Sequence, residues 1–152
     1  MNVFIMRGIP MSGKTTWVTR QLKDLHHSAY EVCSADHFYI DAQGAYNFKP
    51  ENIGQAHDQC LNDFIDAIAD RTTESVFVDN TNLSAWEIAP YYRLAEFHKH
   101  KVEIIRTCCT FEAAMKRPNI HGVPADRLWY MYQTLLREQL PLHWKERFVM
   151  ND

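Results

Sequence analysis

The sequence lacks an apolar run long enough to cross a membrane, and it lacks an excess of basic residues. Its apolar stretches, such as residues 3–6, are strand-length, far below the ~20 residues that a membrane helix needs. The formal net charge is −3 and the isoelectric point is near 6.2, whereas a long nucleic-acid track normally shows as a basic domain. We therefore expect no membrane partner, no obligate protein partner, and only local contact with any polynucleotide.

Cysteine pairs of the C-x-x-C type and an N-terminal signal peptide are missing as well. The four cysteines, Cys33, Cys60, Cys108 and Cys109, form no such pair, so neither a zinc site nor a redox motif is indicated. A chain of 152 residues is long enough to bury a core without disulfides. We expect one domain over residues 1–152 in the cytoplasm, or in the host cytoplasm if the protein is phage-encoded.

Short β-branched or aromatic segments alternate with longer helical patterns along the chain. Strands are expected at residues 2–6, 30–34, 75–79 and 101–107, and the main helices at 12–25, 50–71, from 84 onward and 124–137. Such alternation predicts an α/β fold with a mostly parallel sheet that is covered by helices on both faces. Residues 138–152 show no clear pattern and are left as a tail without an assigned structure.

The segment GIPMSGKT at residues 8–15 matches the phosphate-binding pattern G-x-x-x-x-G-K-[ST] in full. It follows an expected strand and opens an expected helix, which is the context that the pattern requires. Its glycines let backbone N–H groups and the helix N-terminus point at phosphate oxygens. The pattern predicts binding of ATP and Mg²⁺, with Lys14 on the phosphates and Thr15 on the metal. The expected nucleotide-binding residues are Gly8, Pro10, Met11, Ser12, Gly13, Lys14, Thr15 and Thr16.

Three further charged residues fall where ligands bind in parallel sheets, beyond the carboxyl ends of strands or in a loop. Asp79 ends an expected strand, and either supports the metal or ties its own loop by local hydrogen bonds. Asp36 follows another strand, and is either a general base or a capping aspartate. Arg117 begins a polar loop at about residues 117–123, and is either a lid arginine or a solvated charge.

Aromatic residues gather just after Asp36. Phe38, Tyr39, Tyr46 and Phe48 lie within a short stretch that also contains an expected turn at residues 41–44. Such a cluster can stack on a nucleobase, but aromatic clusters also form ordinary core. The sequence alone leaves both interpretations open.

Taken together, these segments resemble the P-loop polynucleotide 5′-hydroxyl kinase family, in particular its short phage-like and NEDD4-binding-protein-like branch. The resemblance covers roughly residues 1–137. It rests on the segments GIPMSGKT at 8–15, SADHFY at 34–39, VDNTNL at 78–83 and NIHGVP at 119–124, and on Ala56, His57, Cys60 and Phe64.

The resemblance implies a nucleotide-kinase fold with a four-stranded sheet and a small lid. It also implies Asp36 as general base, Asp79 at the metal, and Arg117 as the lid arginine that contacts the nucleotide. One position departs from the phage enzymes, because Tyr39 stands where they place a substrate-binding arginine; Asp36 and Tyr39 are thus the expected substrate contacts. The implied activity is γ-phosphate transfer from ATP to a nucleic-acid hydroxyl. A small-molecule kinase and an ATP-dependent switch are the alternatives.

Overall fold

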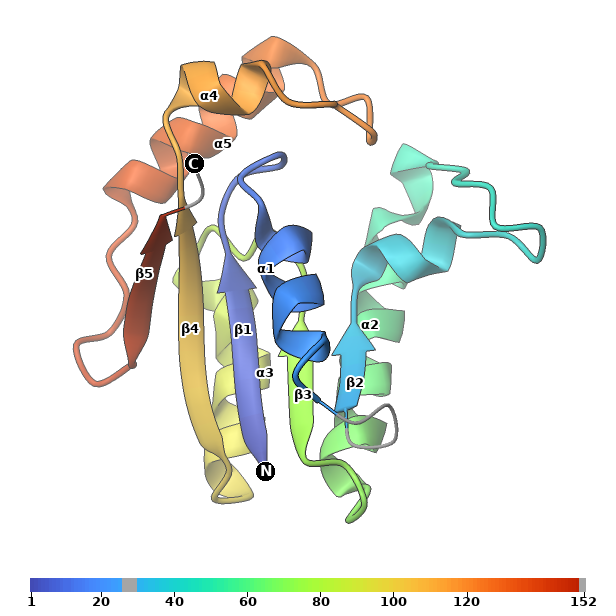
Figure 1. Cartoon of the computed structure of the whole chain (residues 1–152), viewed down its shortest axis with the longest axis vertical. Helices are drawn as coiled ribbons and strands as arrows, with labels where there is room; N and C mark the ends of the chain where they lie inside the picture. The colour runs from blue at the N-terminus through green and yellow to red at the C-terminus, as the bar shows by residue number, and fades with distance from the viewer. Residues whose placement is uncertain (26–29, 151–152) are drawn as a thin grey trace.

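The computed structural model describes residues 1–25 and 30–150. Within these residues, five parallel strands form one sheet in the order β2-β3-β1-β4-β5 (Figure 1). None of the described helices is long and apolar enough to span a membrane. The strands are β1 Asn2–Arg7, β2 Tyr30–Cys33, β3 Ser75–Val78, β4 Lys101–Cys108 and β5 Glu146–Met150. The helices are α1 Lys14–Leu22, α2 Ile53–Ala69, α3 Ala85–Phe97, α4 Phe111–Met115 and α5 Ala125–Arg137, with 3-10 turns η1 Ala35–Tyr39 and η2 Pro50–Asn52.

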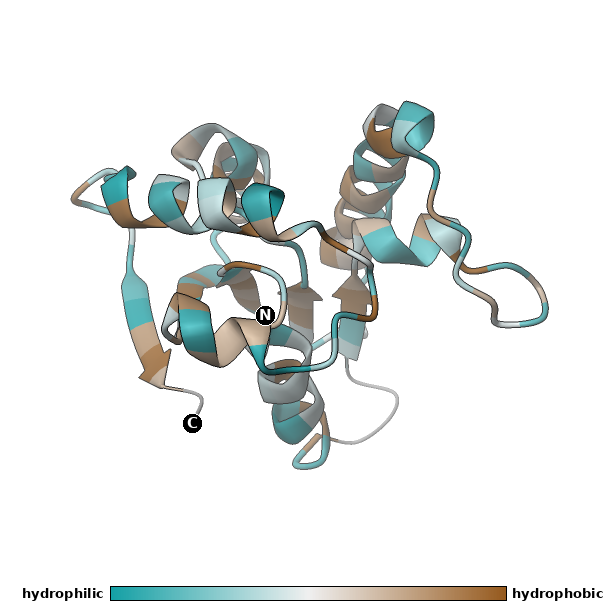
Figure 2. Cartoon of the chain, turned by 90° about the horizontal axis from the view of Figure 1, so that it is seen from above, coloured by the Kyte–Doolittle hydropathy of each residue, from teal (hydrophilic) through white to brown (hydrophobic). Residues whose placement is uncertain are grey.

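Helices cover both faces of the sheet, as the alternation of elements predicted. Val3 and Ile5 of β1 point to one face, where they pack with residues of α2 and α3 such as Phe64. Met6 points to the opposite face and packs with Trp17 of α1. This division follows from the strand geometry, because successive side chains point to opposite sides. Seen from above, the central strands are coloured as hydrophobic, whereas α5 alternates between hydrophilic and hydrophobic residues (Figure 2).

The prediction of a four-stranded sheet is wrong, because the unassigned tail contributes a fifth strand. β5 pairs with β4 in parallel, from Ile104 opposite Glu146 to Cys108 opposite Met150. Arg7, which is 1% exposed, anchors this strand by donating from Nη1 to Glu146 Oε1 at 2.7 Å. A buried cation needs such a partner, and β5 supplies it from the far end of the chain.

A third apolar cluster lies beyond the carboxyl ends of the strands. Ile9 of the phosphate loop and Leu83 after β3 pack there against Ala114 of α4 and Leu128 and Leu135 of α5. α4 and α5 therefore sit over the edge of the sheet at which the polar residues gather, and the segment that joins them passes above this edge (Figure 1).

Candidate active site

The loop at residues 8–15 joins β1 to α1 and is packed tightly against the end of β4. A Cβ added to Gly8 would lie 2.4 Å from Thr107 Oγ1 and 2.6 Å from Ser12 Oγ. Those two hydroxyl oxygens are themselves hydrogen-bonded at 2.6 Å. Gly13 adopts a left-handed conformation with φ 92° just before the helix begins at Lys14, a conformation that favours glycine. Each glycine of the pattern thus has a local steric reason.

Lys14 follows this loop at the start of α1, and its side chain folds back onto the loop backbone. Its Nζ donates a hydrogen bond to Ile9 O at 2.9 Å. Burial lowers the pKa of Lys14, and the carboxylates of Asp79 and Asp36 act in the opposite direction. The half-buried ammonium thus lies in the field of two acidic side chains, and a phosphate anion would add a strong partner.

Thr15 and Asp79 form a polar pair beneath the loop. Thr15 Oγ1 donates to Asp79 Oδ2 at 2.7 Å, whereas Asp79 Oδ1 is buried and has no hydrogen-bond partner among the described residues. Burial raises the pKa of Asp79, and Lys14 and the Thr15 hydroxyl partly oppose this. A buried carboxylate oxygen without a protein partner is a position at which water or a metal ion can bind. Together with a threonine hydroxyl it fits Mg²⁺, which takes one or two protein carboxylates plus substrate phosphates.

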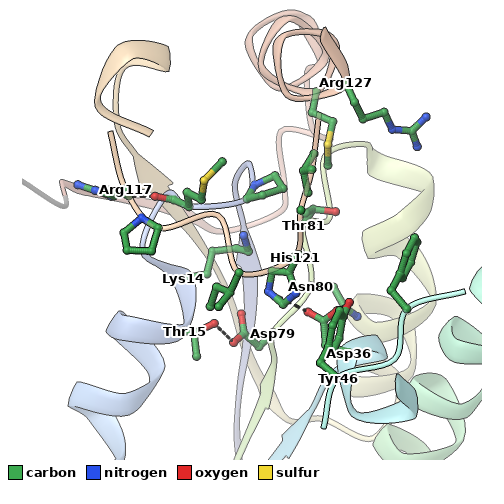
Figure 3. Close-up of a pocket in the computed structure, with 18 of the residues that line it drawn as sticks. Lys14, Thr15, Asp36, Tyr46, Asp79, Asn80, Thr81, Arg117, His121 and Arg127 are labelled. Carbon is green, nitrogen blue, oxygen red and sulfur yellow. Dashed lines mark hydrogen bonds and ion pairs between the residues drawn. The ribbon is translucent and has the colours of Figure 1, made fainter. Parts of the chain in front are cut away.

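Asp36 stands on the other side of the same cleft, at the start of η1. The N-cap of this turn is Ser34, whose Oγ accepts from the Asp36 backbone N–H at 3.3 Å, so the Asp36 carboxylate is not needed as a cap. Its Oδ1 accepts a hydrogen bond from Tyr46 Oη at 2.8 Å. Its Oδ2 lies 3.8 Å from His121 Nε2, and the Asp36 side chain remains 47% exposed. The carboxylate is therefore held in place yet accessible (Figure 3).

Hydrogen bonds between the ends of β2 and β3 fix the relative positions of Asp36 and Asp79. Ser34 Oγ donates to Asp79 O at 2.9 Å, and Asn80 Oδ1 accepts from Ala35 N–H at 2.9 Å. Both bridging side chains are buried. The two carboxylates thus extend from strand ends that are hydrogen-bonded to each other, which fixes their relative position as catalytic groups require.

Arg117 reaches the phosphate loop from the segment after α4. Its Nη1 donates to Met11 O at 3.0 Å, and the side chain is half-buried. The lid loop, defined as residues 117–123, lines the cleft with most of its residues, among them His121 (Figure 3). The structure therefore brings Arg117 to the nucleotide side of the cleft, while its action on a transferred phosphate stays a prediction.

The aromatic cluster divides into a buried and an exposed part. Tyr39 is 6% exposed, donates from its hydroxyl to Lys49 O at 3.4 Å, and does not line the main cleft. It packs against Tyr46 and Phe48, with ring centroids 5.8 and 5.0 Å away, and both of these residues line the cleft. Tyr39 therefore supports the cleft wall from behind Tyr46 and Phe48, and its contact with a substrate stays a prediction.

One cleft of about 980 Å³ connects these groups. It runs from Lys14 and Thr15 to Asp36 and Tyr46, and continues to Arg127 in the first turn of α5 (Figure 3). Pro10, Met11, Gly13 and Thr16 also line it, whereas Gly8 and Ser12 are buried parts of the loop that do not line the cleft. Its volume is at the upper end of the range for ligand pockets, so it has room for two substrates.

Comparison with known proteins places this arrangement in a family. A family model described as an AAA domain matches residues 3–120. The chain belongs to this AAA-domain family. The match covers the phosphate loop, Asp36, Asp79 and Arg117, and ends inside the lid loop.

One relative of this AAA domain is a much longer protein. NEDD4-binding protein 2 from Homo sapiens is 34% identical over 133 residues, which are 85% of this chain and 7% of that protein. The chain thus spans a small part of that relative's length.

Solved structures with the same fold include kinases. A chain of the Pnkp1/Rnl/Hen1 RNA repair complex has a TM-score of 0.66 at 15% identity, over 89% of this chain and 44% of that one. The Mycobacterium tuberculosis APS kinase CysC, solved with AMPPNP and APS, has a TM-score of 0.62 at 15% identity, over 99% and 88% of the two chains. This AAA domain therefore has the α/β fold of P-loop kinases.

Sequence reasoning missed three residues of the site as site residues: Tyr46, His121 and Asn80. The sequence shows Tyr46 only as a member of the aromatic cluster, and the turn expected at residues 41–44 is the signal that the chain folds back beside Asp36. His121 lies in the expected lid loop, but nothing in the sequence shows which wall of the cleft it meets. Asn80 follows Asp79 directly, and its bond to Ala35 depends on the pairing of β2 with β3.

Proposed function

We propose that this domain transfers the γ-phosphate of ATP to a hydroxyl of a nucleic acid, at its 5′-OH end. The observation that carries the proposal is the accessible carboxylate of Asp36, which lines the same cleft as Lys14 and Thr15 of the phosphate loop. A base on one wall and a phosphate cradle on the other is the arrangement that in-line phosphoryl transfer to a hydroxyl requires.

The phosphate side of the cleft offers two cations and one metal-binding pair. Lys14 exchanges its bond to Ile9 O for phosphate oxygens when the nucleotide binds, and Arg117 adds a bidentate donor from the lid loop. Thr15 and Asp79 are the residues that would hold Mg²⁺, because Asp79 Oδ1 is buried without a hydrogen-bond partner among the described residues. The ion would supply neutralisation of the charge on the β- and γ-phosphates.

The acceptor side depends on Asp36. The acceptor oxygen forms a bond to the γ-phosphorus while the bond from that phosphorus to the β–γ bridging oxygen breaks, and ADP leaves. The proton of the acceptor hydroxyl passes to the Asp36 carboxylate. Positioning and charge stabilisation supply most of the rate, because this reaction requires no covalent enzyme intermediate.

Four observations support a nucleic acid as the acceptor. The segments at residues 8–15, 34–39, 78–83 and 119–124 resemble polynucleotide 5′-hydroxyl kinases, and a structural relative is part of an RNA repair complex. Beyond Asp36, the cleft is lined by Phe48, which is 47% exposed and is available to stack on a base. Arg127 also lines it and makes no hydrogen bond or ion pair among the described residues, so we assign it to an acceptor phosphate.

The test is transfer of label from γ-³²P-ATP to a panel of acceptors: 5′-OH and 5′-phosphate oligonucleotides of DNA and RNA, free nucleosides, and small hydroxyl metabolites. We expect labelling of 5′-OH oligonucleotides, none of their 5′-phosphate counterparts, and none by Lys14→Ala. Preference for a free nucleoside or metabolite would replace the polynucleotide by a small-molecule acceptor. Slow ATP hydrolysis without any labelled acceptor would indicate a nucleotide-dependent switch instead.

A further inference from the structure

Tyr46 reaches Asp36 because a tight loop returns the chain to η1. Asp41 Oδ1 accepts from the N–H groups of Gln43 and Ala45 at 3.0 and 2.8 Å, and these bonds lower the pKa of Asp41. Ile40 and Tyr46 then pair as an isolated antiparallel bridge. The side chain of Tyr46 is thus presented to the cleft by a loop with its own hydrogen-bonded framework.

The two oxygens of Asp36 have different surroundings. Oδ1 accepts from Tyr46 Oη at 2.8 Å, a hydrogen bond to an ionisable acceptor of the strong class. Oδ2 has His121 Nε2 at 3.8 Å, which is beyond hydrogen-bond distance. One oxygen is therefore fixed by the protein while the other remains available in the cleft.

The ring of Tyr46 is itself held from two sides. Tyr39 packs against it with its ring centroid 5.8 Å away, and His121 of the lid loop lies edge-on at 5.1 Å. Burial is the main cause that raises the pKa of Tyr46, and its bond to Asp36 is the next. The hydroxyl therefore stays protonated and can act as a fixed donor.

We infer that Tyr46 is a positioning residue for phosphoryl transfer: it holds Oδ1 of Asp36 so that Oδ2 receives the proton of the acceptor hydroxyl. The inference rests on the proposed function. An aspartate side chain on an exposed turn can otherwise rotate about its terminal bond, and misplacement of a base lowers the rate without changing substrate binding. The contact with His121 also joins this positioning to the lid loop.

The test compares Tyr46→Phe with the parent protein, using whichever acceptor the parent labels best. We expect kcat to fall roughly 10- to 100-fold, as for loss of a hydrogen bond to a charged group, while KM for ATP and acceptor changes by less than about threefold. In an Asp36→Asn background the same change should have almost no effect, because the two residues act through one bond. Tyr92→Phe is the control, since it removes a hydroxyl whose partner is the distant Lys145 N–H.

A second measurement tests the hydrogen bond between Tyr46 and Asp36 and does not depend on an activity assay. Tyrosine ¹³Cζ signals, with Tyr46 assigned by through-bond correlations in the uniformly labelled parent, should show a lower pKa of Tyr46 in Asp36→Asn than in the parent, because the carboxylate charge is gone. The Tyr92→Phe spectrum checks the assignment.

The outcomes separate the inference from the proposed function. If the parent labels no acceptor, both fail. If the parent is active but Tyr46→Phe keeps kcat within about twofold, or loses the same factor with and without Asp36, the positioning role is overturned while the kinase assignment stands. An unchanged Tyr46 titration in Asp36→Asn overturns it as well, even where Tyr46→Phe proves too unstable to assay.

Discussion

Gly8→Ala is the substitution whose effect can be worked most directly from the structure of the phosphate loop. The new methyl group would lie 2.4 Å from Thr107 Oγ1 and 2.6 Å from Ser12 Oγ. Both side chains are buried, with exposures of 1% and 0%, and they bond each other at 2.6 Å. The methyl group therefore has to separate two hydroxyls that cannot form replacement hydrogen bonds to solvent.

The expected loss of stability has two parts. Forcing an extra carbon into a packed interior costs about 1–3 kcal/mol, and loss of the buried hydrogen bond between Ser12 and Thr107 costs about 0.5–1.5 kcal/mol more. At about 2–4 °C per kcal/mol for a chain of this size, the melting temperature should fall by at least about 3 °C. Affinity for ATP should fall with it, since the same loop forms the phosphate cradle.

The assay is urea unfolding followed by circular dichroism, with Gly54→Ala as the matched control. Gly54 lies in α2, and an added Cβ would meet nothing within 4 Å, so alanine should stabilise the helix by about 0.5–1 kcal/mol. The two glycine substitutions thus have opposite expected signs. A Gly8→Ala midpoint equal to that of the parent would refute the close packing of the loop on Thr107.

The remaining predictions concern the fifth strand, the lid and the acceptor. Glu146→Ala should lower the free energy of unfolding by about 3 kcal/mol, because it leaves the Arg7 cation buried without its partner; an unchanged urea midpoint would contradict the anchoring of β5. Arg117→Ala should lower kcat and kcat/KM together in steady-state kinetics, as for an interaction made in the transition state, whereas a rise in KM alone would exclude the lid role. The logarithm of the binding constant for a single-stranded acceptor should fall with the logarithm of salt concentration at a slope of about −0.7 to −2, which corresponds to contacts with one to three phosphates. A steeper slope would indicate contacts with more phosphates.

The central part of the fold could be predicted because local patterns determine it. The run at residues 3–6 and the segment at 75–78 are short and apolar, and the phosphate loop between β1 and α1 has a specific pattern of its own. The carboxyl ends of parallel strands meet at one edge, which is why Asp36 and Asp79 could be placed in the same cleft from their positions alone.

β5 could not be predicted because it depends on contacts that are remote in sequence. Glu146 meets Arg7 across the sheet, and Phe148 and Met150 remain 60% and 71% exposed, so the strand shows little apolar periodicity. Tyr46 and Tyr39 illustrate the same limit in the site. Both are tyrosines near Asp36, and the bridge between Ile40 and Tyr46, together with the hydrogen bonds of Asp41, brings Tyr46 to the carboxylate.

One set of initial rates tests transfer of phosphate to a 5′-OH end with Asp36 as base. A short 5′-OH oligonucleotide, a longer one and the matching free nucleoside are labelled from γ-³²P-ATP by the parent and by Asp36→Asn. We expect similar rates for the two oligonucleotides, a much lower rate for the nucleoside, and a loss of roughly 10²–10⁴ in kcat for Asp36→Asn at unchanged ATP affinity. Equal rates for parent and Asp36→Asn, or a faster reaction with the nucleoside, would contradict this assignment.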